Sequence, residues 1–253
     1  MLLHGLGASW QVWRAVGERL SPELRVIAVD LPGFGKSSEL AGGRFPLPEV
    51  AARLAAMLDQ LGVGSHTVAG HSMGGGVALV HALARPEAVR AIALVAPAGL
   101  IATGDVRRSW RLPLVHRAGR EITRVVAPIV PRSPALRRLA LSRLVADPLA
   151  LDEQTIRELA RGSRDGRSTG AAGTAIVHAG LRDRIDRVRV PVLVVFGEED
   201  RVIDPAGGPR LAAALPSARL LMLPRTGHMP MIERPDEVAA AILALTHEPT
   251  PVP

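Results

Sequence analysis

The chain has 253 residues, of which 47% are hydrophobic and 22% are charged, and it carries a formal net charge of +7. This length and composition favour a globular protein with a sizeable core and exclude a disordered or fibrous chain. Because the sequence contains no cysteine, it can form no disulfide, no cysteine nucleophile and no thiolate zinc site.

Short β-branched runs alternate with longer helical patterns along most of the chain. The runs predict strands at residues 25–29, 67–70, 91–96, 192–197 and 220–224, and the helical patterns lie at 10–20, 47–61, 74–85, 205–215 and 236–245. Strands that alternate with helices predict an α/β fold, with a mostly parallel sheet of about six strands and helices on both faces.

Residues 101–189 interrupt this alternation and contain no convincing strand. They carry helical patterns at 135–145 and 152–160, so we expect a helical insertion between the two parts of a core formed by residues 1–100 and 190–247. Residues 248–253 contain three prolines and are expected to form a disordered tail.

The basic excess of the chain lies in this insertion, because residues 101–190 contain 18 Arg and nine acidic residues. Solvated faces of amphipathic helices explain such arginines, and attraction to anionic lipid surfaces or acidic substrates is the alternative. Peripheral membrane contact through this segment therefore stays open. No recognition motif accompanies the charge and aromatic residues make up only 2% of the chain, so we expect no nucleic-acid partner.

No apolar run reaches the ~20 residues that a membrane span requires, and the first residues lack the pattern of a signal peptide. The expectation is a cytoplasmic protein with no transmembrane segment. The sequence leaves its oligomeric state open.

The strongest local motif is Gly70-His71-Ser72-Met73-Gly74, which lies directly between a predicted strand and a predicted helix. A nucleophilic serine on a sharp strand-to-helix turn requires this arrangement, because side chains at the two glycine positions would clash. The alternative is that Ser72 is an ordinary residue at the start of a helix.

A serine nucleophile requires a base and an acid that orients the base. Asp200 follows the predicted strand 192–197, and His228 follows the next one, so both belong to the edge of a parallel sheet where ligands bind. The order Ser72, Asp200, His228 is typical of such a triad. The rival acids are Glu198, Glu199 and Asp204, and a buried structural histidine is the alternative for His228.

With these motifs the sequence resembles the α/β-hydrolase fold family, in its serine-esterase and lipase-like branch. The resemblance rests on His4-Gly5-Leu6-Gly7, on Asp30-Leu31-Pro32-Gly33-Phe34-Gly35-Lys36-Ser37, on the serine motif, on residues 197–205 and on Gly227-His228. It implies an oxyanion hole formed by the backbone N–H groups of Leu6 and Met73, and it implies that the insertion is a helical cap over the pocket. The serine argues against the relatives that use an aspartate at this position.

The sequence departs from the family in its first residues, because only Met1–Leu3 precede His4 where members usually carry two further strands. We therefore expect an exposed sheet edge at 25–29 and a frayed terminus near Leu6. The run Gly35-Lys36-Ser37 ends like a phosphate-binding loop, but Asp30 stands where that loop requires glycine. A turn typical of the α/β-hydrolase family, above the active site, is therefore favoured over a nucleotide-binding loop.

The sequence thus predicts a serine hydrolase that cleaves a carboxylic ester of a small or medium apolar substrate through an acyl-enzyme, with no cofactor. No metal site is expected, since the remaining histidines lie scattered along the chain. The alternatives are C–C-bond hydrolysis, cofactor-free peroxidase-like chemistry or acyl transfer in the same family, or a degenerate homologue that only binds a ligand.

Overall fold

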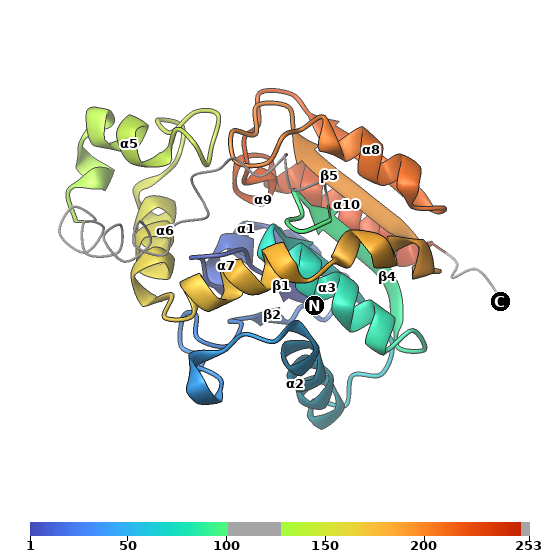
Figure 1. Cartoon of the computed structure of the whole chain (residues 1–253). Helices are drawn as coiled ribbons and strands as arrows, with labels where there is room; N and C mark the ends of the chain where they lie inside the picture. The colour runs from blue at the N-terminus through green and yellow to red at the C-terminus, as the bar shows by residue number, and fades with distance from the viewer. Residues whose placement is uncertain (101–127, 249–253) are drawn as a thin grey trace.

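Six strands form one sheet in the computed structural model, which describes residues 1–100 and 128–248 (Figure 1). The strand order is β2-β1-β3-β4-β5-β6, and every neighbouring pair is parallel. The strands are β1 (Leu2–Leu3), β2 (Ala28–Val29), β3 (His66–His71), β4 (Val89–Val95), β5 (Val192–Gly197) and β6 (Ala218–Leu223). The predicted α/β fold with a mostly parallel sheet is confirmed.

Helices cover both faces of the sheet (Figure 1). One face carries α2 (Leu47–Gln60), α3 (Met73–Ala84) and α8 (Gly207–Ala214), and the other carries α1 (Arg14–Leu20) and α10 (Pro235–His247). Side chains of β5 alternate between the two layers: Val194 joins the core under α3, and Val195 joins the core under α10. Because both faces are covered, this strand is an uninterrupted apolar run.

Most predicted elements lie within a few residues of their observed bounds, and β5 matches the prediction at both ends. The main difference is β2, which was predicted over 25–29 and spans only Ala28–Val29. Its partner β1 has two residues, so the ladder consists of Leu2 opposite Ala28 and Leu3 opposite Val29. The length of β2 is therefore set by its neighbour rather than by its own apolar run.

The first residues of the chain are held inside the sheet. β2 is the edge strand, as predicted, whereas β1 pairs with β2 on one side and with β3 on the other. Leu3 is fully buried, and the amino group of Met1 donates a hydrogen bond of 2.7 Å to the carbonyl oxygen of Thr67. This two-sided pairing anchors the residues before Leu6, in contrast to the frayed terminus expected from the sequence.

Between β4 and β5, the described residues form helices and no strand. The longer helices are α5 (Pro134–Leu141), α6 (Glu153–Asp165) and α7 (Thr169–His178), and short 3-10 turns lie at Val130–Arg132 and Leu181–Arg187. The first two correspond to the predicted helical patterns, and the sequence analysis missed α7. Residues 128–189, the described part of the expected insertion, are called the cap, while residues 101–127 of that insertion lie outside the described residues.

Three short helical turns complete the described chain: Trp10–Trp13 before α1, Ala41–Gly43 before α2, and α9 (Pro230–Glu233) before α10. Glu248, assigned to a disordered tail from the sequence, lies 2.6 Å from the guanidinium of Arg219 as an ion pair. The rest of that tail, residues 249–253, lies outside the described residues. Across 1–100 and 128–248, no helix has both the length and the apolar character needed to cross a bilayer.

Candidate active site

The three residues of the predicted triad lie after the carboxyl ends of three strands of the same parallel sheet. Ser72 follows β3 directly, Asp200 follows β5, and His228 follows β6. In a parallel sheet these ends share one edge, and that edge is where ligands bind in open α/β folds. All three residues are buried.

Ser72 occupies a strained turn between β3 and α3. Its φ of 49° and ψ of −115° lie where residues other than glycine are rarely found, and its side chain makes no capping hydrogen bond to α3. A Cβ atom on Gly74 would lie 2.5 Å from the carbonyl oxygen of Leu3, so the helix begins close against the end of β1. Ser72 therefore does not act as an ordinary helix cap here.

His228 and Asp200 form a buried pair. Nδ1 of His228 lies 2.8 Å from Oδ2 of Asp200, and the two side chains are 3% and 0% exposed. The other carboxylate oxygen of Asp200 accepts the backbone N–H groups of Val202 at 2.7 Å and Ile203 at 2.9 Å. Because Nδ1 donates to the carboxylate, Nε2 of His228 carries the lone pair and can accept a proton.

The rival acids point elsewhere. Glu198 is exposed, Glu199 lies 3.5 Å from Arg201, and Asp204 lies 3.6 Å from Arg210. Asp200 is therefore the carboxylate that contacts His228, although the sequence analysis weighed all four.

His71 connects the turn at Ser72 to the segment between β6 and α9 that carries His228, which is called the histidine loop. Its Nε2 donates a hydrogen bond of 2.8 Å to the carbonyl oxygen of His228, and the two imidazole rings lie 4.7 Å apart. Burial holds the pKa of His71 well below its ordinary value, and the neighbouring His228 adds to this effect. His71 is therefore neutral at pH 7 and adds no positive charge beside the base.

The turn that contains Leu6 approaches Ser72 from the end of β1. A Cβ atom on Gly5 would lie 2.6 Å from Nδ1 of His71 and 3.1 Å from Cβ of Ser72. His4 braces this turn, because its Nδ1 lies 2.7 Å from the carbonyl oxygen of Gly5 and its Nε2 accepts the N–H of Leu31 at 3.0 Å. The first N–H group of a helix has no partner within that helix, and Met73 is the first residue of α3.

The loop with Gly35-Lys36-Ser37 is organised by a carboxylate rather than by a helix. Asp30 accepts the backbone N–H of Trp10 at 2.8 Å and that of Lys36 at 3.0 Å. No helix begins directly after Ser37, and a phosphate-binding loop requires one. Through Asp30, this loop is therefore joined to the segment that begins at Trp10.

Two residues at this site were not singled out from the sequence. His71 lies inside the serine motif but had no assigned role, and Glu233 lies in α9, just after His228. The carboxylate of Glu233 accepts the backbone N–H of Gly227 at 2.8 Å. Each residue lies close in sequence to a catalytic motif, and this closeness was the only signal of a role. No spacing rule predicts which backbone group either side chain binds.

The described residues contain no group of three or more histidines, aspartates and glutamates arranged to hold a metal ion. The structure does bring two scattered histidines together, because Nε2 of His66 lies 2.9 Å from Nε2 of His81. His66 begins β3 and His81 lies in α3, so the pair lies at the opposite end of β3 from Ser72.

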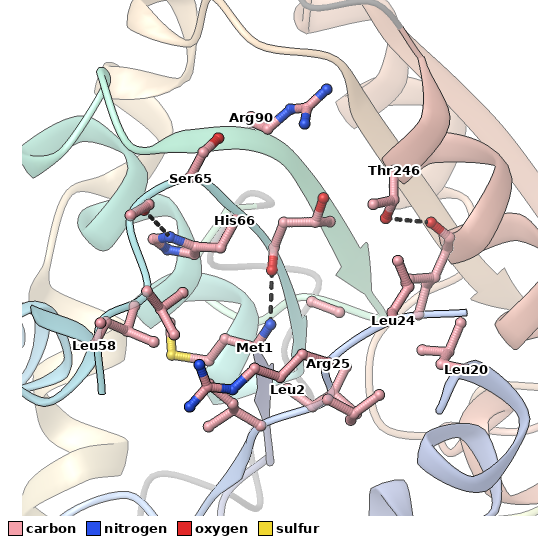
Figure 2. Close-up of a pocket in the computed structure, with 18 residues that line it drawn as sticks. Met1, Leu2, Leu20, Leu24, Arg25, Leu58, Ser65, His66, Arg90 and Thr246 are labelled. Atoms are coloured by element: carbon pink, nitrogen blue, oxygen red, sulfur yellow. Dashed lines mark hydrogen bonds between the residues drawn. The ribbon is translucent and has the colours of Figure 1, made fainter. Parts of the chain in front are cut away.

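A cavity of about 400 Å³ opens at the amino ends of the strands, away from the candidate triad (Figure 2). Met1 lies at its centre in Figure 2, and Leu24, Leu58, His66 and Arg90 belong to its lining. Ser72, Asp200 and His228 do not belong to it. The cavity is thus separate from the edge where the candidate triad lies.

A model of the alpha/beta hydrolase fold family matches residues 1–235. The chain therefore belongs to the alpha/beta hydrolase fold family, as its motifs predict. It is also similar to solved structures, including a thermophilic esterase from Thermogutta terrifontis, with a TM-score of 0.76 and 25% identity over 98% of this chain and 89% of that one.

Two curated relatives are similar over almost the whole chain. The chain is 34% identical, over 251 residues, to the dihydrolipoyllysine-residue acetyltransferase component of the acetoin cleaving system of Pseudomonas putida, and it spans 62% of the length of that protein. It is 30% identical to the pimeloyl-(acyl-carrier protein) methyl ester esterase of Nitrosomonas europaea, over 97% of this chain and 94% of that protein. Together these likenesses identify a member of a hydrolase family.

Proposed function

We propose that the protein is a serine hydrolase that cleaves carboxylic esters through an acyl-enzyme intermediate. The buried hydrogen bond of 2.8 Å between His228 and Asp200 carries this proposal, because it sets the histidine tautomer that a serine nucleophile requires. The strained turn at Ser72 supports it further, since it places the serine directly after the end of a strand, as a nucleophile elbow does.

In the first half of the reaction, Nε2 of His228 accepts the hydroxyl proton of Ser72 while the serine oxygen attacks the ester carbonyl. Asp200 stabilises the imidazolium that forms and keeps its own negative charge. His228 then returns the proton to the leaving alcohol, and the acyl group remains on Ser72. In the second half, His228 takes a proton from water as the water oxygen attacks the acyl-enzyme, and it then returns this proton to the oxygen of Ser72 as the acid is released.

The negative charge on the carbonyl oxygen of the tetrahedral intermediates requires hydrogen-bond donors. We assign this role to the backbone N–H groups of Met73 and Leu6. Met73 begins α3, and the positive end of the helix dipole favours an anion there. Each donor lowers the barrier by about 3 kcal/mol, by analogy with measured donors of this kind. No cofactor enters this mechanism.

The relatives support ester chemistry. One is named a methyl ester esterase, one is a monoacylglycerol lipase of Rattus norvegicus at 25% identity, and one solved structure is an esterase. We therefore propose a small or medium apolar ester as the substrate. The acyl chain length stays open and can be read from a series of p-nitrophenyl esters.

Acyl transfer is the second candidate, and the relative named an acetyltransferase is the observation that favours it. The first half of the reaction would be the same, and an alcohol or thiol would replace water in the second half. Because the two candidates share the acyl-enzyme, they differ only in which acceptor releases the acyl group. Adding alcohols and thiols to a hydrolysis assay measures this partition directly.

The decisive experiment is covalent labelling of the folded protein with a fluorophosphonate, followed by identification of the labelled residue. A catalytic site incorporates the label at Ser72, and the variant Ser72→Ala loses both the label and the hydrolysis of p-nitrophenyl acetate. A wild-type protein that is folded but does not label would be a ligand-binding homologue instead. Hydrolysis retained by Ser72→Ala would overturn the assignment of the nucleophile.

A further inference from the structure

Glu233 connects the cap to the loop that carries His228. One carboxylate oxygen accepts the backbone N–H of Ala146, in the cap, at 2.7 Å, and the other accepts the backbone N–H of Gly227 at 2.8 Å. The backbone N–H of Met229 also bonds to this carboxylate. A single side chain therefore holds the residues on both sides of His228 and one residue of the cap.

The two segments that Glu233 joins are also in direct contact. A Cβ atom on Gly227 would lie 2.8 Å from the backbone nitrogen of Ala146 and 2.8 Å from Cα of Val145. Only glycine allows the histidine loop to approach the cap so closely. The carboxylate thus closes a contact at which two backbones meet without intervening side chains.

The carbonyl group of His228 itself is held from the opposite side, by His71. The carbonyl oxygen of His228 accepts the Nε2–H of His71, next to Ser72. With Gly227 and Met229 bound to Glu233, the main chain around His228 is fixed in three places, and Asp200 then fixes the direction of the imidazole. Small errors in the position of a catalytic base lower its rate strongly, so such bracing has a catalytic consequence.

No described arginine or lysine forms an ion pair with Glu233. Burial raises the pKa of this carboxyl to about 7; the three backbone N–H bonds oppose that rise, and the charge of Asp200 adds to it. Even partial burial of a carboxylate costs folding free energy, and a carboxyl whose pKa is shifted in this way is often found at a functional site.

We propose that Glu233 is a positioning residue for His228, and that it couples the docking of the cap at Ala146 to the alignment of the catalytic base. The inference rests on the proposed function in one respect, because it takes His228 as the base. The ionised carboxylate accepts all three N–H groups, whereas its protonated form turns one oxygen into a donor and loses part of this binding.

Among the described residues, the charged groups that lie near Glu233 in space or in sequence include Asp200, Asp147 and Arg234. Asp200 lies close enough to raise the pKa of Glu233, and Asp147, which follows Ala146 in the sequence, has its carboxylate bound to the N–H of Leu149. Arg234, the next residue in the chain, is bound to Glu237 instead. The binding by Glu233 is therefore expected to depend on pH near neutrality through Glu233 itself.

The test compares Glu233→Gln with Glu237→Gln, which removes the same charge from the start of α10. In Glu233→Gln we expect kcat for p-nitrophenyl acetate to fall about tenfold to a hundredfold with little change in KM. The rate of fluorophosphonate labelling at Ser72 should fall by a similar factor. Glu237→Gln should keep the wild-type kinetics. Wild-type kcat and wild-type pH dependence in Glu233→Gln would overturn the proposal.

A second measurement does not depend on activity. In the wild-type protein, the backbone amide resonances of Ala146 and Gly227 should shift together with pH, with a midpoint near that of Glu233. Amide resonances that do not shift with pH would overturn the proposal even if Glu233→Gln failed to fold. If the amides titrate and the wild-type protein neither labels nor hydrolyses esters, the connection stands and the proposed function fails.

Discussion

Nδ1 of His228 lies 2.8 Å from Oδ2 of Asp200, and both side chains are buried beneath the carboxyl ends of the strands. Asn at position 200 would present an amide in place of the carboxylate and favour the wrong histidine tautomer. We expect Asp200→Asn to lower kcat by about 10⁴-fold while the protein stays folded, as in the serine protease triad. The measurement is steady-state hydrolysis of p-nitrophenyl acetate.

The matched control for this change is Glu199→Gln, which alters an exposed carboxylate in the same loop. It should keep the wild-type rate. If Asp200→Asn were fully active and one of Glu199→Gln and Asp204→Asn were not, the acid of the triad would have to be reassigned.

The backbone conformation at Ser72 predicts a trade between stability and activity. A φ of 49° strains the backbone of a residue that carries a Cβ atom, whereas glycine adopts this conformation without strain. We expect Ser72→Gly to raise the free energy of unfolding by about 1 kcal/mol relative to Ser72→Ala. Both variants should be inactive. Urea denaturation of the two variants measures the difference, and equal midpoints would show that the turn is not strained.

The approach of α3 to β1 predicts a large effect at Gly74. A Cβ atom there would lie 2.5 Å from the carbonyl oxygen of Leu3 and 2.6 Å from that of His4, and backbone atoms cannot move aside cheaply. We expect Gly74→Ala to lower the free energy of unfolding by roughly 2 kcal/mol and to displace the turn beside Ser72. Thermal unfolding and labelling of Ser72 report the two effects.

Gly170→Ala is the control, because a Cβ atom at this position in α7 meets nothing within 4 Å. Alanine favours the helix by about 0.5–1 kcal/mol over glycine, so this variant should be slightly more stable than the wild type. A Gly74→Ala protein as stable as Gly170→Ala would contradict the close packing of α3 on β1.

Buried His4 predicts acid sensitivity. Burial lowers its pKa to about 4 from an ordinary value of 6.5, so the unfolded chain binds the proton more readily than the folded one. The stability that this group contributes is complete above pH 6.5 and is lost as the pH falls toward 4. The loss amounts to about 3 kcal/mol at most.

Urea unfolding of the wild type and of His4→Gln between pH 4.5 and 7.5 measures this contribution. Burial also lowers the pKa values of His71 and His81, so the wild type should lose stability in acid for several reasons with the same sign. The slope with pH should be smaller in His4→Gln. An unchanged slope would mean that His4 takes up a proton without unfolding.

The features that were predictable from sequence are those encoded by neighbouring residues. β5 is an apolar run closed by Gly197, and the serine turn is a motif of five consecutive residues, so both were located correctly. The length of β2 was wrong because it depends on a partner strand of two residues. α7 was missed because it is rich in alanine and glycine and has no strong polar face.

The connections around His228 could not be predicted in this way. His71 contacts a carbonyl oxygen 157 residues further along the chain, and Glu233 contacts an amide 87 residues earlier. No local pattern encodes such a pair, because each partner is a backbone group that any residue type supplies. The side chains that carry the chemistry are therefore easier to find from sequence than those that hold them.

The contact between Val145–Ala146 and Gly227 also bears on engineering of substrate range. Exchanging caps between relatives is an obvious way to test specificity, since the cap contacts the loop that carries His228. A transplanted segment would have to bring a backbone N–H group to the place that Ala146 occupies, and it would have to leave room for Gly227. A chimaera designed only around the new pocket would therefore keep the three triad residues but lose the contact that holds the loop around His228.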